Sequence, residues 1–295
     1  MDEKTLLEHW LEAKRIVRET RERGEPEFPT GLGFVDRATG GMQRGEIWVI
    51  SGKTGSGKSA LAMQLARSFA DKQHHSILFL SLEMRGWDLC LRMFCEMTGI
   101  DYSQLKLGTI EIPKEIDATF QDYLAKIDFE IIERGYEFGE VEKVITYYYK
   151  NKKPDIIFLD FIQLIDWKKY GDERIAIMEY IRKIKELANT MNIGFVVVSQ
   201  IRRLPSGADY NRPPDLSDLK GSGSLEQLAD KVIFIYREFK DMVSLPNYYI
   251  NLAKNRQGQT ILSQVEFEGK CYRFREMIQG TILNKAQNTF GGSIV

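Results

Sequence analysis

Eight consecutive residues, Gly52 to Ser59, have the composition and spacing of a phosphate-binding loop. They match the pattern G-x-x-x-x-G-K-[ST] at every fixed position, as Gly52, Lys53, Thr54, Gly55, Ser56, Gly57, Lys58 and Ser59. The glycines let the backbone curl, so that its N–H groups point inward at phosphate oxygens. Lys58 is then placed to reach the β- and γ-phosphates, and Ser59 to supply a hydroxyl to Mg²⁺. The spacing predicts a site for a nucleoside triphosphate.

The segments on either side of this loop have the patterns that the motif requires. Ile47 to Ile50 form a short apolar run rich in strand formers. After the loop, Leu61, Ala62, Leu65 and Ala66 recur at helical spacing. A simpler explanation is a Gly/Ser turn that happens to hold a lysine. The order strand, loop, helix favours the phosphate-binding interpretation.

Three polar residues follow predicted buried strands. Asp160 closes the run IIFLD, where a carboxylate for Mg²⁺ belongs. Glu83 ends the strand that follows the phosphate-loop helix, and it is suited to orient or deprotonate the attacking water, although it could instead cap the helix after it. Gln200 is suited to hydrogen-bond the γ-phosphate, or is simply a polar residue at a strand end. Because parallel strands bind ligands at their carboxyl ends, the three together favour a catalytic site.

Two cations lie at the tip of a predicted hairpin. Lys254 and Arg256 follow the strand YYINLA and precede the turn Gln257-Gly258. Cations at such a tip can reach the γ-phosphate bound by a neighbouring subunit, as an arginine finger does. The alternative is a solvated basic turn.

The wider pattern of apolar runs predicts an α/β fold, with a mostly parallel sheet, helices on both faces and antiparallel hairpins at one edge. Strands are expected at residues 47–50, 76–82, 129–132, 156–160, 193–199, 231–236, 248–253 and 263–267, with a last pair around 271–274. Helices are expected at residues 3–24, 140–149, 175–191 and 225–229, and one carries residues 89–94. Residues 100–126 resemble a mixed helical insertion, and residues 202–224 a loop. The predicted division is a helix and linker at 1–29, one large domain at 30–280 and a tail at 281–295.

The N-terminal helix is amphipathic. Leu6, Trp10, Ala13 and Val17 recur at steps of four, three and four, and Gly24 ends the pattern before a linker. A single helix cannot bury such a stripe by itself. It either folds back on its own domain or docks on a neighbouring subunit.

Composition limits the possible partners. The chain has 295 residues, 43% hydrophobic and 28% charged, and a net charge of −1. There is no overall basic field, so a nucleic-acid site must be local or be created by assembly. Cys90, Cys95 and Cys271 lack metal-binding spacing, and one would remain after any pairing, which favours a reducing compartment. Without the apolar core of a signal peptide or a membrane-spanning run, we expect a soluble, cytoplasmic protein.

Several segments, taken in order from about Thr30 to Phe274, resemble the motor domain of DnaB-type replicative helicases. They are TGLGFVDRATGGMQRGE, LSLEM, LDFIQLI, VVSQ, LSDLKGSGSLEQLADKVIFIYRE and AKNRQG. The resemblance implies a RecA-like core that assembles as a homo-hexameric ring around single-stranded DNA, with ATP and Mg²⁺ bound between subunits. It implies ATP-driven movement, expected 5′ to 3′, and unwinding of duplex DNA.

Roles for individual residues follow from the same resemblance. It implies phosphate and metal contacts for Lys58, Ser59 and Asp160, a catalytic base in Glu83, a sensor in Gln200, and trans-acting cations in Lys254 and Arg256. The segment from Asp218 to Leu225 corresponds to the loop that holds the DNA backbone, with Lys220, Gly221, Ser222 and Gly223 at its centre. Arg202 and Arg203 are basic residues nearby in sequence, and we include them as candidate DNA contacts.

The chain departs from the family pattern in two ways. Lys220 stands where an arginine is usual and Gly221 where a glutamate is usual. The large N-terminal collar domain is missing, which suggests a truncated protein or a compact helicase of phage or mobile-element origin. A primase or helicase loader remains a possible partner. Two rival functions stay open: a recombinase-like filament ATPase, and a regulatory ATPase that is not a motor.

Overall fold

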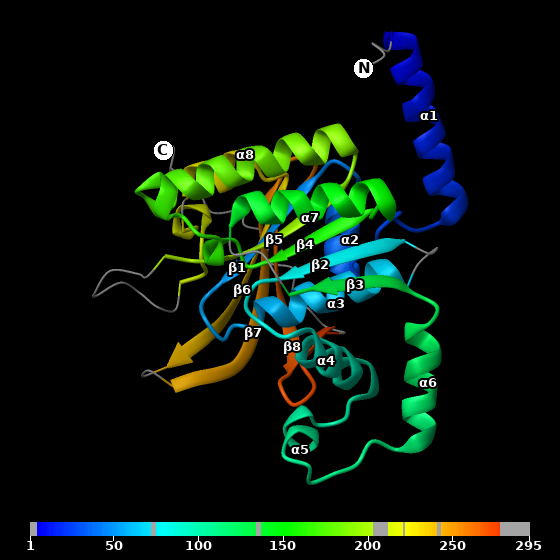
Figure 1. Ribbon diagram of the computed structural model, residues 1–295, viewed down its shortest axis with the longest axis vertical. Helices are drawn as coiled ribbons and strands as arrows, with labels where there is room; N and C mark the ends of the chain where they lie inside the picture. The colour runs from blue at the N-terminus through cyan, green and yellow to red at the C-terminus, as the bar shows by residue number, and fades with distance from the viewer. Residues whose placement is uncertain are drawn as a thin grey trace, which may run out of the picture.

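A sheet of nine strands forms the centre of the molecule (Figure 1). The computed structural model describes residues 5–71, 75–133, 137–202, 212–220, 222–240 and 243–277. The strands are β1 Ile47–Gly52, β2 Ser76–Ser81, β3 Asp128–Ile132, β4 Ile156–Asp160, β5 Gly194–Gln200, β6 Lys231–Lys240, β7 Val243–Asn255, β8 Ile261–Glu268 and β9 Arg273–Glu276. Their order in the sheet is β3-β2-β4-β5-β1-β6-β7-β8-β9. The first six strands in the chain run parallel and the last three antiparallel, which confirms the predicted mixed sheet.

The parallel strands are buried, and their ends determine where the candidate site lies. β1 and β4 are buried along their whole length, which explains why each is an unbroken apolar run. The register pairs Gly52 with Gln200 and Ser81 with Asp160. Residues that are far apart in the sequence therefore meet at the carboxyl edge of the sheet.

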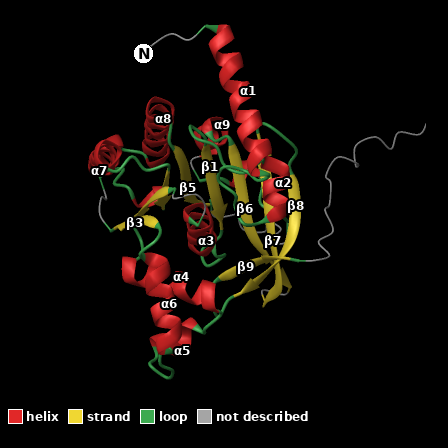
Figure 2. Cartoon of the chain, turned by 90° about the vertical axis from the view of Figure 1, so that its right-hand side faces the viewer, coloured by secondary structure: helices red, strands yellow, loops and turns green. Residues whose placement is uncertain are grey.

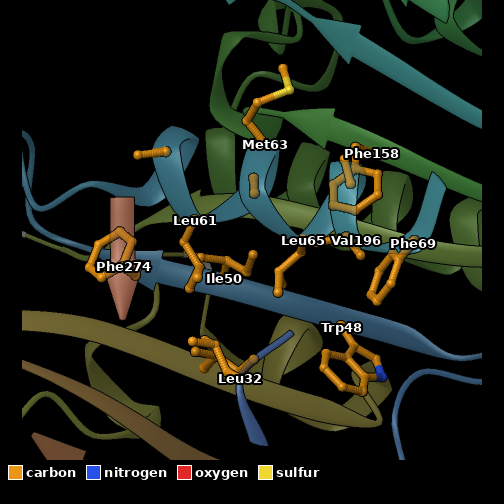
Figure 3. Packing of buried hydrophobic residues seen from close by; sticks show 14 of the residues in the cluster. Leu32, Trp48, Ile50, Leu61, Met63, Leu65, Phe69, Phe158, Val196 and Phe274 are labelled. Carbon is orange, nitrogen blue, oxygen red and sulfur yellow. The ribbon is translucent and has the colours of Figure 1, made fainter. Parts of the chain in front are cut away.

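Helices cover both faces of the sheet (Figures 1 and 2). One face packs against α2 Gly33–Thr39, α3 Lys58–Ala70 and α4 Gly86–Thr98, and the other against α7 Phe138–Asn151, α8 Glu173–Met191 and α9 Ser222–Leu228. In β1, Trp48 and Ile50 belong to the first core, whereas Ile47 and Val49 belong to the second, because successive strand side chains point to opposite faces. Figure 3 shows Leu61 of α3 beside Ile50. The sheet lies between the two cores, and α3, which follows the phosphate loop, packs in the first of them.

Two regions lie outside this layered centre. The insertion predicted to be partly helical contains α5 Tyr102–Lys106 and α6 Lys114–Leu124. The N-terminal helix α1 Leu6–Arg23 begins with a capping box between Thr5 and Glu8, and Gly24 caps its end. It projects away from the sheet (Figure 2), and none of its residues is buried in the described structure. α1 therefore does not fold back on its own domain, and docking on a neighbour stays a prediction.

Some predicted boundaries were wrong, and hydrogen bonding explains each difference. α8 begins at Glu173, not at 175, because the Asp172 side chain caps it. β7 continues to Asn255 because it remains paired with β6, so Lys254 lies inside the strand and does not follow it. The segment 202–224 is not one loop: it includes a 3₁₀ turn at Leu216–Asp218 and the start of α9. Among the described helices, none is long and apolar enough to cross a membrane.

Candidate functional site

The phosphate loop joins β1 to α3 at the carboxyl edge of the sheet. Gly55 and Gly57 have φ angles of 75° and 94°, in the left-handed region that favours glycine. α3 then begins at Lys58, so its first N–H groups and its positive dipole end face the loop. The Lys58 Nζ atom donates a hydrogen bond of 2.9 Å to the carbonyl of Lys53. The motif thus has the strand, loop and helix that its sequence predicts.

A cavity of about 370 Å³ lies beside this loop. Its lining comes from the loop and from several distant segments: Thr54, Gly55, Gly57, Lys58, Ser59, Ala60, Glu83, Met84, Arg92, Phe161, Gln200, Phe267 and Tyr272. Burial lowers the pKa of the Lys58 ammonium group, and the nearby Asp160 and Glu83 carboxylates oppose this change. The structure therefore brings together the residues predicted for phosphate, metal, water and γ-phosphate contacts.

Asp160 is fully buried at the end of β4. Neither of its carboxylate oxygens makes a hydrogen bond within the part of the chain that the structure describes. Burial, with a further contribution from the Glu83 charge, raises the pKa of Asp160 to about 6, although the nearby Ser59 hydroxyl and the Lys58 and Arg92 charges oppose the rise. A buried carboxylate without partners is costly, and a divalent cation would remove that cost. Mg²⁺ is commonly held by one or two carboxylates together with substrate phosphates, so Asp160 and Ser59 fit it.

Glu83 lies in the bend between β2 and α4, and its side chain is exposed. The Ser81 hydroxyl fixes this bend, because it donates to the Met84 carbonyl at 2.6 Å and accepts from the Met84 N–H at 3.2 Å. Glu83 does not cap α4. The N-cap of α4 is Arg85, without a side-chain cap, and the Gly86 N–H donates to Glu133. The alternative interpretation of Glu83 as a helix cap is therefore wrong.

Gln200 connects the cavity to the region predicted to hold DNA. Its side-chain amide donates a hydrogen bond to the Thr54 hydroxyl in the phosphate loop. Its backbone carbonyl accepts from the Lys220 N–H at 3.3 Å. Gln163, a residue that the sequence did not single out, accepts from the Gln200 N–H at 3.2 Å and donates to the Ser199 hydroxyl at 2.7 Å. Gln163 is three residues after Asp160, so its hydrogen bonds connect the segment that follows β4 to the end of β5.

Six residues that line the cavity were not predicted as site residues, and three of them, Arg92, Phe267 and Tyr272, offer a charge or an aromatic ring from outside the quoted motifs. Arg92 comes from α4, and its guanidinium carbon lies 4.3 Å from the centre of the Tyr272 ring. Phe267 and Tyr272 come from the β8–β9 hairpin. The only signal for Arg92 was its helical spacing from Asp88, with which it forms an ion pair of 3.5 Å. Nothing local marked the two aromatic residues.

The two candidate trans-acting cations lie away from this cavity. The Arg256 guanidinium lies 3.1 Å from the Asp230 carboxylate, and it also donates to the Gln227 carbonyl. The Lys254 ammonium group donates to the Glu226 carbonyl, at the end of α9. Neither cation is among the described residues that line the cavity. That Lys254 and Arg256 contact the nucleotide of a neighbouring subunit stays a prediction.

The DNA-binding prediction falls on a segment joined to β5. The Arg202 N–H donates to the Asp218 carbonyl at 2.8 Å, and the Lys220 ammonium group lies 2.8 Å from the Glu173 carboxylate. Ser222 and Gly223 form the start of α9. Arg203 and Gly221 lie outside the described residues. Lys220 and Arg202 also line one shallow groove beside the start of α8.

Comparison with known proteins identifies the family. A family model described as "DnaB-like helicase C terminal domain" matches residues 28–276, and the chain belongs to that family. A probable plasmid replicative DNA helicase of Chlamydia trachomatis is 30% identical over 251 residues, which cover 84% of this chain and 54% of the relative. The replicative DNA helicase DnaB of Treponema pallidum is 30% identical over 266 residues, covering 87% and 58%. The chain spans little more than half the length of these relatives.

Solved structures confirm the fold. The ATPase domain of G40P superposes with a TM-score of 0.79 at 23% identity, covering 94% of this chain and all of that one. A DnaB-like replicative helicase, described with its interactions with primase, gives 0.77 at 24% identity and covers 90% of this chain and 68% of that one. The predicted RecA-like fold is therefore correct, as is the predicted family.

Proposed function

We propose that this chain is the ATP-driven motor of a DNA helicase, which moves on single-stranded DNA 5′ to 3′ and unwinds duplex. One observation carries the proposal. Gln200 contacts the phosphate loop through its side chain and Lys220 through its backbone. A change in the nucleotide cavity therefore has a direct hydrogen-bonded route to the candidate DNA residues. A motor needs such a connection, whereas a simple ATP-binding switch does not.

We further propose ATP and Mg²⁺ as the cofactors. Lys58 binds the β- and γ-phosphates, Asp160 and Ser59 hold the metal ion, and Glu83 takes a proton from the attacking water. Gln200, which contacts Thr54 of the phosphate loop, stabilises negative charge on the γ-phosphate, and Arg92 adds a positive charge to the cavity lining. Bound Mg²⁺ supplies charge neutralisation on the transferred phosphoryl group. The Phe267 and Tyr272 rings offer apolar faces to a nucleobase.

Assembly completes the proposed site. Lys254 and Arg256 act on the γ-phosphate of a neighbouring subunit, because they do not reach the cavity of their own. The exposed apolar stripe of α1 supports the same assembly, since Leu6 and Val17 are 87% and 69% exposed in a single chain. Six copies of Lys220 around one channel would create the positive field that a chain of net charge −1 lacks. The proposed hexamer works in the cytoplasm, with a primase or a helicase loader as further partners.

The experiment that tests this function is ATP hydrolysis measured with and without single-stranded DNA. We expect strong stimulation by the strand, because Lys220 and the cavity are joined through Gln200. Stimulation is expected to fall in Lys220→Ala, and the salt dependence of DNA binding to decrease by about one unit of slope. Lys183→Ala, which removes an exposed cation elsewhere on α8, is the matched control.

Other outcomes favour the rival functions. Robust hydrolysis that ignores DNA would favour a regulatory ATPase. Open helical filaments seen by electron microscopy, in place of closed rings, would favour a recombinase-like protein.

A further inference from the structure

A short aromatic and basic segment between β4 and α8 takes no part in the nucleotide cavity. It covers residues 166–172, with the sequence DWKKYGD. The Trp167 side chain is 41% exposed, and Lys168 and Lys169 beside it are also exposed. A large aromatic ring flanked by two cations is the combination found where proteins hold single-stranded nucleic acid.

This segment is anchored from its inner side. The Tyr180 hydroxyl of α8 donates to the Asp166 carbonyl, and the Asp166 carboxylate accepts from the Lys168 N–H at 2.9 Å. The Tyr170 ring meets the Tyr180 ring edge-on, with centroids 5.5 Å apart. Asp166 and Tyr170 thus fix both ends of a 3₁₀ turn against α8. Trp167 lies between these two anchors, so its ring is displayed on a rigid support.

The segment leads directly to the candidate DNA residues. It is followed directly by Glu173, the first residue of α8, whose carboxylate contacts the Lys220 ammonium group at 2.8 Å. Glu173 lies six positions after Trp167 in the chain, so the Cα atoms of the two residues lie within ~20 Å of each other. Arg174 and Arg202 line the groove that Glu173 and Lys220 also line. Lys168, Lys169 and Arg174 thus lie in the short stretch of chain that leads from Trp167 to this groove, beside the acidic Asp172 and Glu173.

We propose that Trp167 stacks on a base of the single strand whose backbone is held at Lys220, with Lys168 and Lys169 on its phosphates. The inference rests on the proposed function, because it assumes DNA at Lys220. Stacking accepts any sequence, since every base has a π-face. It also discriminates between strands, because a paired base inside a duplex is already stacked on its neighbours. Trp167 would thus give the motor a preference for single-stranded over duplex DNA.

The test compares the binding of two fluorescent oligonucleotides of equal length, one of thymidines and one abasic, by anisotropy. Trp167→Ala is expected to weaken binding of the thymidine strand about 5- to 100-fold, which is the range for one stacked base. It is expected to leave binding of the abasic strand and the salt slope unchanged, because an indole carries no charge. Trp167→Phe is expected to retain most of the affinity. Trp87→Ala removes a similarly exposed tryptophan from α4 and is the matched control, expected to bind like the unaltered chain.

The outcomes separate this inference from the proposed function. Equal binding by Trp167→Ala, or an equal loss on both oligonucleotides, would overturn the stacking role. If Lys220→Ala weakens binding while Trp167→Ala does not, only the stacking role fails. If the unaltered chain binds neither strand, the proposed function and the stacking role fail together.

Discussion

The nucleotide cavity and the edge around Lys220 use charge in opposite ways. Asp160 is fully buried and makes no hydrogen bond within the described residues, so its charge is costly in the folded chain. The Lys220 side chain is 39% exposed and is already paired with Glu173. A bound metal ion would neutralise the Asp160 charge and so remove the cost of burying it. The ion pair between Lys220 and Glu173 can be exchanged for another, which suits a ligand that must be bound and released repeatedly.

This contrast predicts that single substitutions have large effects in the cavity and small effects at the edge. In the cavity each charged group acts on one reacting centre in a poorly hydrated site. At the edge, each cation is one of several that are hydrated and screened by salt. Substitutions in the two regions should therefore differ in the size of their effects, and each can be measured.

Asp160→Asn is expected to reduce Mg²⁺-dependent ATP turnover about 10³-fold, because it removes the proposed metal carboxylate. It is also expected to stabilise the metal-free chain. The pKa of Asp160 is raised from its ordinary value of 3.8 to about 6, so the folded state is penalised at every pH above about 6. The penalty fades as the pH falls toward 3.8. The free energy of unfolding at pH 7.5 is therefore expected to rise by about 3 kcal/mol, with a smaller gain at pH 5.

Asp155 provides the matched control for this measurement. It is partly buried, but hydrogen bonds from His75 and Ser76 and the charge of Arg44 outweigh burial and hold its pKa below the usual range. Asp155→Asn is therefore expected to destabilise the chain at neutral pH, which is the opposite sign. If Asp160→Asn also destabilised the metal-free chain, the account of Asp160 as an unpaired buried charge would be wrong.

Arg256→Ala is expected to reduce turnover about 10³-fold while nucleotide binding stays nearly unchanged. The physical reason is that Arg256 serves the transition state in a neighbouring subunit and makes no contact with its own cavity. The measurement is kcat alongside the affinity for a fluorescent nucleotide. Lys185→Ala is the matched control, because Lys185 also pairs with Asp230, at 2.9 Å, and its loss should leave turnover nearly intact.

Mixing two inactive variants tests whether this action crosses between subunits. Arg256→Ala retains its phosphate loop, and Lys58→Ala retains its Arg256. A mixture of the two is expected to regain part of the activity, since a Lys58→Ala subunit can serve the site of an Arg256→Ala neighbour. A mixture that stays inactive would place Arg256 outside the trans-acting role.

The sequence predicted those site residues that belong to a short contiguous pattern, and it missed those that reach the cavity only through tertiary packing. Asp160 and Gln200 each end a contiguous apolar strand, Lys58 belongs to a contiguous motif that directly follows one, and a parallel sheet brings such strand ends to one edge. Arg92 and Tyr272 reach the cavity from a helix and a hairpin far apart in the sequence, so only tertiary packing reveals them. No local pattern encodes such a meeting.

The same distinction explains the errors in the predicted elements. Lys254 was expected after a strand because a basic residue ends the apolar run, but the run of hydrogen bonds to β6 continues through it. α2 was missed because its seven residues are too few to show a helical period, and its burial depends on β8 and α3. The ends of strands and the formation of short helices depend on contacts with residues that are distant in the chain.

Glu173→Gln is expected to have the smallest effect, and it tests the exchangeable edge directly. DNA phosphates must displace Glu173 from Lys220, so removal of this carboxylate should tighten binding of single-stranded DNA by about 2- to 5-fold at low salt. The gain should shrink at high salt, because both competing interactions are screened. Glu179→Gln breaks another exposed ion pair of α8, with Arg182 at 3.2 Å, and should leave binding unchanged. Weaker binding by Glu173→Gln would mean that the pair positions Lys220 for DNA and does not compete with it. The edge would then be preorganised, like the cavity, and the contrast between the two regions would not hold.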